Sequence, residues 1–296
     1  MGLFNNKTKE EQLCDAIDEN NIKKVKSILS SSMKKNIKLK LNEHGSYGNT
    51  ILLLSVIRSN VEITKLLIDY AKENEITLEI NGKNTSKIYP LLESINKNNI
   101  EMTKLIMDYA TENNIILEIN ERSSDRNYPL LKSTENNNIE MTKLLMEYAT
   151  KNNIVLRIND QNDNGDYPLL WCSIKDNIEM TRLLMDYTSK KNVELKMNEL
   201  NKKKYKYSPL VWSLCRNNTE MVQLLMDYAQ KNNIILEFEE SYIGNIIRSN
   251  IKDYIKNISE INNDIIKLLS EASNDNKLKI VYESNSQLLK RIVTEN

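Results

Sequence analysis

The sequence predicts an all-α helical solenoid of about six repeats, followed by one or two degenerate C-terminal repeats, with extended finger loops between helix pairs. The phrase NIEMTKLIMDY at Asn99–Tyr109 recurs nearly unchanged, and its last residue returns at steps of 39, 39, 39 and 41 as Tyr70, Tyr109, Tyr148, Tyr187 and Tyr228. Two further markers keep this spacing: Pro90, Pro129, Pro168 and Pro209, and Asn42, Asn81, Asn120, Asn159 and Asn198. Because three markers share one interval, chance does not explain the pattern.

The repeats divide the chain into three parts. We interpret residues 1–11 as an N-terminal tail, residues 12–240 as the repeat array, and residues 241–296 as a degenerate repeat or C-terminal helical cap. The six repeats are expected to start near residues 12, 51, 90, 129, 168 and 209.

Each repeat is predicted to contain a short helix, a longer helix and an extended segment, as the fifth repeat illustrates. Pro168 suits the first turn of the short helix, where its missing N–H leaves no bond unmade. Asn177 offers an N-cap for the longer helix, and Asn192 tolerates the left-handed turn that ends it. Val193–Met197 then alternates apolar and polar residues, which indicates an extended segment.

Neither helix is expected to be stable alone, because a helix of about ten residues is marginal in water. Its apolar face must be covered, and the regular partner is the neighbouring copy. Stacked copies bury one continuous core, so the chain is predicted to rely on contacts between neighbours and on polar end caps.

The residues of the fifth repeat resemble a known family. Gly165–Leu170, GDYPLL, followed by Asn177–Leu184, NIEMTRLL, is similar to the ankyrin repeat. The resemblance implies an ankyrin-like solenoid that presents its fingers and first helices as a concave binding surface. The unit is longer than the family's usual length of about 33 residues, which suggests a longer second helix and a longer extended segment. Tyr89, Tyr128 and Tyr167 stand where the family has threonine, so its Thr/His hydrogen-bond network is expected to be absent.

Composition points to a protein of the cell interior. Lys and Arg number 41 and Asp and Glu number 41, so no overall field draws the chain to nucleic acid or an anionic membrane. The start lacks the features of a secretory signal, and no apolar stretch is long enough to cross a membrane. Three scattered cysteines, Cys14, Cys172 and Cys215, indicate a reducing compartment. We therefore predict a cytoplasmic monomer, with a nuclear location left open.

The sequence gives no support for an enzyme, a metal or a cofactor. The single histidine, His44, lies in a loop and is expected to be solvated, while Cys172 and Cys215 are expected to be buried side chains. Three dispersed cysteines and one histidine cannot form a standard transition-metal site, and six glycines cannot supply a phosphate-binding loop. The methionines of the second helices are expected to fill the core.

Differences between the copies indicate where a partner would bind. The two residues after each proline stay apolar, but the third varies as Leu54, Glu93, Lys132, Trp171 and Trp212. A slot that accepts Glu, Lys and Trp cannot be deeply buried in every copy, because burying a charge is costly. Positions at the end of the first helix also vary. Trp171 and Trp212, in equivalent slots, are either an interface anchor or packed between helices.

The basic run Asn201–Tyr207 in the fifth finger either meets an acidic partner surface or is a solvated loop. The candidate partner-binding residues are Arg58, Glu93, Asn96, Lys97, Lys132, Glu135, Trp171, Lys175, Lys204, Tyr205, Trp212 and Arg216.

The favoured function is a non-catalytic protein–protein interaction module that binds another protein on the finger and first-helix surface. No small-molecule substrate or membrane partner is predicted, and the balanced charge does not favour nucleic acid. A structural spacer or self-associating scaffold without a dedicated ligand is the alternative. An enzyme with its site in residues 241–296 is a third hypothesis, less favoured because that segment holds no His or Cys.

Overall fold

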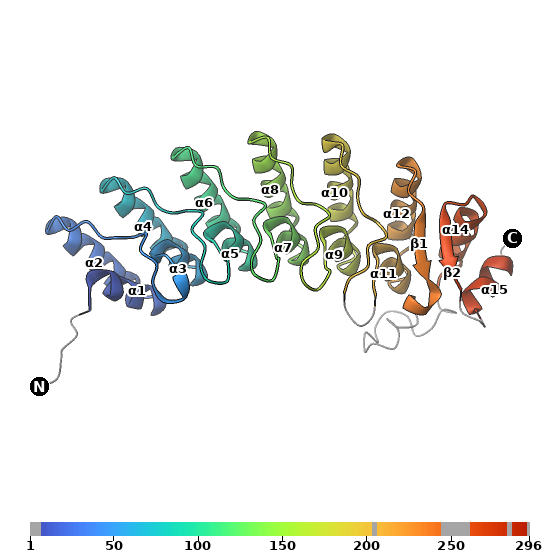
Figure 1. Ribbon diagram of the computed structural model, residues 1–296, viewed down its shortest axis with the longest axis horizontal. Coiled ribbons are helices and arrows are strands. Elements are labelled where there is room, and N and C mark those ends of the chain that lie inside the picture. Colours follow the sequence, from blue (N-terminus) through green and yellow to red (C-terminus); the bar gives the residue numbers. More distant parts are fainter. Residues whose placement is uncertain (1–6, 203–205, 244–260, 283–285, 295–296) are drawn as a thin grey trace, which may run out of the picture. The chain divides into compact units, whose positions relative to one another are not determined.

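The computed structural model describes residues 7–202, 206–243, 261–282 and 286–294, and the chain forms two compact units. Unit 1 comprises Met1–Asn136 with Lys143–Ile154, and unit 2 comprises Asn137–Thr142 with Val155–Asn296. Within each unit, successive helix pairs pack side by side in chain order, for example α3 on α5 in unit 1 and α9 on α11 in unit 2 (Figure 1).

Each repeat contributes a first helix and a longer second helix. The first helices are α1 (Lys9–Asp18), α3 (Ile51–Ile57), α5 (Pro90–Asn96), α7 (Pro129–Glu135), α9 (Pro168–Ile174) and α11 (Pro209–Cys215). The second helices are α2 (Ile22–Lys34), α4 (Val61–Glu73), α6 (Ile100–Glu112), α8 (Ile139–Lys151), α10 (Ile178–Lys191) and α12 (Thr219–Lys231). The short turn η1 (Ser46–Gly48) lies in the first finger.

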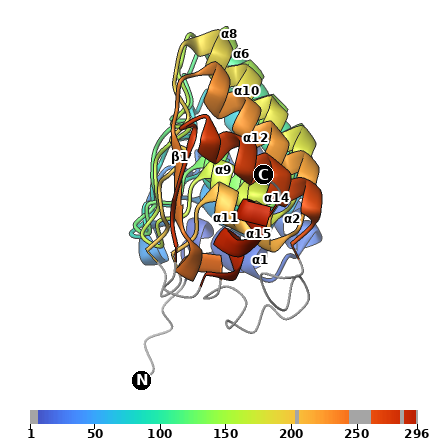
Figure 2. The same cartoon turned by 90° about the vertical axis from the view of Figure 1, so that its right-hand side faces the viewer.

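The C-terminal part adds a small sheet to this helical pattern. β1 (Leu236–Glu239) pairs in parallel with β2 (Leu278–Val281), with Leu236 opposite Leu278, and the helices there are α14 (Asn263–Asn274) and α15 (Gln287–Thr294). Figure 2 shows β1 to one side of α12 and α14. The architecture is therefore mainly helical as predicted, and one pair of extended segments becomes a regular two-stranded sheet.

Asparagine sets both ends of many helices. At the start of α4, α6 and α10, for example, the side-chain oxygens of Asn60, Asn99 and Asn177 accept the N–H three residues on, at 2.8 to 2.9 Å. Of the sixteen non-glycine residues with positive φ in the described ranges, ten are asparagines, which adopt this left-handed conformation at lower cost than most residues. Asn192 after α10 is one of them, as predicted.

The core consists of the apolar faces of the helices and the inward residues of the extended segments. Tyr89, Tyr128 and Tyr167, which precede the prolines, are fully buried. The second-helix methionines are at most 9 % exposed, so their prediction as core residues is confirmed: Met102, Met107, Met141, Met146, Met180, Met185, Met221 and Met226. Free energy gained by burying these faces is shared between neighbouring copies, as solenoid stability requires.

The recurring asparagine of the extended segment joins each copy to the next. Asn81 donates from Nδ2 to the carbonyl of Ile116 (2.9 Å) and accepts the N–H of Glu118 at Oδ1 (3.1 Å). Asn42, Asn159 and Asn198 make the same pair of bonds, the last to β1. The side-chain amide thus takes the place of one pair of backbone hydrogen bonds between adjacent extended segments.

The recurring tyrosine of the second helix makes a second link between copies. The hydroxyl of Tyr109 accepts the N–H of Leu78 at 2.8 Å, and Tyr70, Tyr148 and Tyr187 bond in the same way to the extended segment of the preceding copy. Because the bonded N–H groups belong to buried leucines, the hydroxyls satisfy groups that water cannot reach.

Across the described parts of the chain, no helix has the length and apolar character needed to span a bilayer.

Candidate partner-binding surface

In unit 1, the first candidate residue lies at the end of α3. Arg58 is the C-cap of α3, and its guanidinium donates to Oδ1 of Asp18 from Nε (3.0 Å) and Nη2 (2.7 Å). Both side chains are slightly less than half exposed. The ion pair joins two adjacent copies, so Arg58 is oriented by its neighbour while its outer edge stays accessible.

On α5 and α7, each charged candidate residue is paired with an oppositely charged residue of the same helix or of its C-cap. Glu93 is 12 % exposed, accepts a bond from Nδ2 of Asn96 (3.0 Å), and lies 3.5 Å from Nζ of Lys97. One copy later, Nζ of Lys132 donates to Glu135 at 2.6 Å. The third position after the proline, held by Glu93 and Lys132, is thus partly buried in both copies. Each of these charges is paired with an oppositely charged side chain, which a ligand could displace.

In unit 2, Trp171 and Lys175 lie together on α9 and its C-cap. Trp171 is partly exposed, and Nζ of Lys175 lies 5.4 Å from the ring centroid, a cation–π distance. Lys175 itself is exposed. This pair offers a partner a partly exposed indole with a cation stacked over its ring.

Trp212, in the equivalent slot of α11, does not share this exposure. It is 5 % exposed, and its ring meets Tyr207 edge-on with centroids 5.1 Å apart. Arg216, the C-cap of α11, donates to the carbonyl of Ile174. Trp171 is therefore partly exposed, whereas Trp212 is buried. The hypothesis that both indoles form an interface anchor is corrected: only Trp171 is accessible to a partner.

The two remaining candidates, Lys204 and Tyr205 of the fifth finger, lie outside the described residues. At the base of that finger, Oδ1 of Asn201 accepts the N–H of Tyr207 at 3.0 Å.

The three cysteines and the single histidine all lie within the described residues. Burial raises the pKa of the Cys172 and Cys215 thiols, and burial with the nearby carboxylate of Asp18 raises the pKa of Cys14 to about 11, so all three are poor nucleophiles at neutral pH. His44 is about half exposed and lies 3.4 Å from Glu79. In the described ranges, no cluster of His, Cys, Asp and Glu could hold a metal ion.

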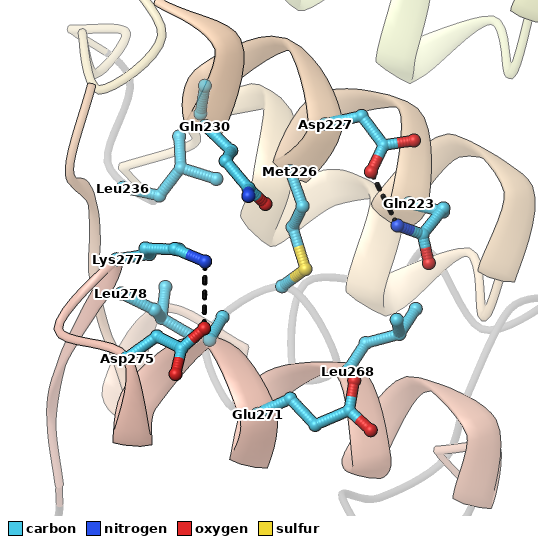
Figure 3. Close-up of a pocket in the computed structure, with 12 residues that line it drawn as sticks. Gln223, Met226, Asp227, Gln230, Leu236, Leu268, Glu271, Asp275, Lys277 and Leu278 are labelled. Carbon is cyan, nitrogen blue, oxygen red and sulfur yellow. Dashed lines mark hydrogen bonds and ion pairs between the residues drawn. The ribbon is translucent and has the colours of Figure 1, made fainter. Parts of the chain in front are cut away.

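A shallow hollow of about 110 Å³ lies between α12 and α14. Figure 3 shows Met226, Leu236 and Leu278 facing it, with the Asp275–Lys277 ion pair (2.7 Å) at one side. The carboxylates at its rim are exposed. The hollow is a groove between α12 and α14, and half of the residues that line it are polar or charged.

One exposed surface in unit 1 was missed by the comparison of copies described above. It lies at the end of α2 and in the segment after it, and we call it the N-terminal lysine patch: Met33, Lys34, Lys35, Ile37 and Lys38. Local charge could have indicated it, because residues 22–41 contain seven lysines and no acidic residue, although the whole chain is balanced.

Comparison with known proteins identifies the repeats. The family profile described as ankyrin repeats (3 copies) matches residues 91–197 and 152–235. An ankyrin repeat domain from Acinetobacter baumannii is similar in structure, with a TM-score of 0.53 and 17 % identity over 73 % of this chain and 97 % of that domain. The ankyrin repeat domain of Bcl-3, a member of the IkappaB family, gives 0.52 and 15 % over 75 % and 86 %.

No curated protein sequence matches the chain. The structural likeness, at these low identities, bears on the fold alone, and it confirms the prediction of an ankyrin-like helical solenoid.

Proposed function

Residues 91–235 of this chain belong to the ankyrin repeat family, and from this premise we propose that the protein is a non-catalytic module that binds another protein on its finger and first-helix surface. Ankyrin repeats generally serve as protein–protein interaction modules and are typically non-enzymatic. The buried thiols, with their raised pKa values, are in keeping with a protein that performs no nucleophilic chemistry.

The observation that carries the proposal is the variation of one backbone site among near-identical copies. The third residue after the proline is Glu93 in α5, Lys132 in α7 and Trp171 in α9, and all three are partly exposed. The two residues before each of them are buried leucines. A repeated scaffold that keeps its core and changes its accessible side chains is suited to recognising one extended partner surface.

The mechanism is presentation of side chains that are already fixed before contact. Arg58 is held by Asp18, Glu93 by Asn96, and Lys175 lies over Trp171. A partner that binds such residues loses less conformational entropy than one that must order flexible loops, so more of the contact energy appears as affinity.

Site-specific photo-crosslinking in the native cell tests the proposal. A crosslinking amino acid replaces Lys97 in unit 1 or Lys175 in unit 2, and matched proteins carry it at the exposed second-helix positions Asp108 and Asp186. We expect the same partner protein to be captured from the first-helix positions and not from the second-helix positions. Equal capture from all four, or from none, would contradict the proposed surface.

Trp171→Ala provides a second test with a built-in control. Because Trp171 is partly exposed, its removal is expected to weaken partner capture and to lower the thermal midpoint only modestly. Trp212→Ala should instead lower the midpoint, because it removes a buried ring. A spacer without a ligand, the alternative function, predicts that neither substitution alters any binding and that mass rises with concentration in sedimentation.

A further inference from the structure

The N-terminal lysine patch carries the largest local charge imbalance in the described chain. Residues 22–41 hold seven lysines without a single Asp, Glu or Arg, whereas the full chain has 41 basic and 41 acidic residues. Three of these lysines are paired: Lys24 with Glu19 (3.2 Å), Lys26 with Glu62 (2.7 Å) and Lys40 with Glu43 (2.7 Å). Lys23, Lys34, Lys35 and Lys38 have no ion-pair partner within the described residues.

Two exposed apolar side chains lie between the lysines of the patch in the sequence. Met33 is 44 % exposed and Ile37 is 39 % exposed, and Asn36 between them has a φ of 52°, which turns the chain sharply at this point. Every residue from Met33 to Lys38 is exposed. Cations and apolar groups thus alternate around one corner of the first repeat.

Equivalent positions in the other copies show that this combination is specific to the first repeat. The Met33 slot is polar in every later copy, occupied by Lys72, Thr111, Thr150, Ser189 and Gln230. The Lys34 slot holds glutamate in the next two copies and lysine again in the three after them, while the Ile37 slot holds Ile or Val in every copy. The Lys38 slot is never lysine in the later copies: Thr77, Ile116, Val155, Glu194 and Ile235. The fold therefore accepts polar residues in the Met33 slot and residues other than lysine in the Lys38 slot, so Met33 and Lys38 set the first repeat apart without a structural need.

We propose that the N-terminal lysine patch binds an acidic segment of a partner protein, with an aliphatic side chain of that segment covering Met33 and Ile37. The proposal goes beyond the proposed function, because it assigns a second binding surface at the end of α2 rather than on the fingers and first helices. Carboxylates of the segment would pair with Lys34, Lys35 and Lys38, and closing the site over the two apolar side chains would remove water from these ion pairs and strengthen them.

An anionic membrane is the other surface that lysines attract, and the packing of α2 argues against it. A helix that lies on a bilayer buries a wide apolar face in the lipid. The apolar face of α2, formed by Val25, Ile28 and Leu29, is already buried in the repeat core. Only the partly covered side chains of Met33 and Ile37 remain, an area that fits one or two side chains of a peptide.

Peptide selection on the full-length chain tests the proposal. Random peptides displayed on phage are selected on the wild type and then measured against Lys34→Gln, Lys35→Gln, Lys38→Gln combined. The matched control combines Lys26→Gln, Lys40→Gln, Lys65→Gln, three exposed lysines that already have carboxylate partners, so both triple variants lose the same charge. All substituted positions are exposed, so both proteins should fold.

We expect the selected peptides to be rich in Asp and Glu. Their affinity should fall about tenfold or more in the patch variant, remain close to wild type in the control, and fall with added salt. Peptides without acidic enrichment, or equal binding to both variants, would overturn the proposal. So would phosphatidylserine vesicles that bind the wild type through the patch while no peptide does.

Met33→Thr tests the apolar half separately, because threonine occupies this slot in two later copies and the net charge is unchanged. A several-fold loss of peptide affinity is expected from the lost apolar contact. Unchanged affinity would restrict recognition to charge and remove Met33 from the site. If peptide binding fails while crosslinks from Lys97 and Lys175 persist, the proposed function stands and this assignment falls.

Discussion

At the scale of single residues, asparagine carries much of the local structure of this chain. It caps second helices at their first residues, adopts left-handed φ after them, and bridges extended segments of adjacent copies. Each role needs a short side chain with both a donor and an acceptor, or a residue that tolerates positive φ. The high asparagine usage therefore has a structural reason at these repeated positions.

The bridging asparagines are predicted to couple neighbouring copies. Asn81→Ala removes the bonds to Ile116 and Glu118 and leaves both backbone groups to find water, so we expect a loss of about 1 to 2 kcal/mol in the free energy of unfolding. Amide hydrogen exchange at Glu118 should become faster.

Asn113→Ala is the matched control for this substitution, because the Asn113 amide bonds only within its own helix, to the carbonyl of Tyr109 (2.8 Å). It should leave exchange at Glu118 unchanged. If both variants expose Glu118 equally, the bridge is not what protects it.

The asparagine marker also shows how far sequence alone reaches. Its spacing of 39 residues placed it in the extended segment of each copy, but the direction of its amide could not be predicted. That direction depends on where the backbone of the next copy passes, which is a property of stacking. The left-handed role of Asn192 was predictable, because it depends on that residue and its own helix.

At the scale of elements, buried tyrosines connect helices to extended segments. The hydroxyl of Tyr109 on α6 accepts the N–H of Leu78, in the segment that follows α4, and the ring is 2 % exposed. Tyr89 and Tyr167, at the first-helix N-caps, donate to the carbonyls of Glu118 and Glu199 (both 2.8 Å). These tyrosines provide cross-repeat hydrogen bonds in a chain where the family's threonine is replaced.

Tyr109→Phe is expected to cost about 1 to 2 kcal/mol, because the N–H of buried Leu78 would lose its acceptor while the ring still fills its space. Denaturant unfolding measures the change. Tyr47→Phe is the control: its side chain is 79 % exposed, and no change is expected. Equal midpoints for the two variants would show that the Tyr109 hydroxyl contributes nothing to stability.

The two tryptophans show what sequence comparison could not decide about the candidate site. They occupy the same slot, yet Trp171 is partly exposed and Trp212 is buried. The reason lies outside the slot: Tyr207 packs against the Trp212 ring, at a position where the preceding copy has Asp166. A different residue in the preceding loop thus alters the exposure of a helix residue, and the spacing of the repeats does not predict that contact.

At the scale of the whole chain, ion pairs between neighbouring second helices recur within each unit, and other residues take their places at the two ends of the repeat array. Basic residues of one second helix pair with acidic residues of the next, as in Lys65–Glu101 in unit 1 and Arg182–Glu220 in unit 2. The first copy has Lys23 in the acidic slot. In α12, Gln223 occupies the basic slot and bonds to Asp227 of its own helix (2.6 Å). The regular pairs thus give way to other residues where the regular copies end.

Deletion of residues 241–296 tests whether the C-terminal segment acts as a cap. It removes α14, whose Ile265, Ile266 and Leu269 are buried, and it leaves β1 without β2. The exposed face of α12 and the open edge of β1 would then be free to associate with other chains. We therefore expect the truncated protein to aggregate and to bind a hydrophobic dye, as measured by light scattering and fluorescence.

A shorter deletion, residues 287–296, removes α15 alone and should have a smaller effect, because α14 and the β1–β2 pair remain. A monomeric deletion of residues 241–296 with the wild-type thermal midpoint would mean that the repeats before it are stable without a cap, and that residues 241–296 serve another purpose.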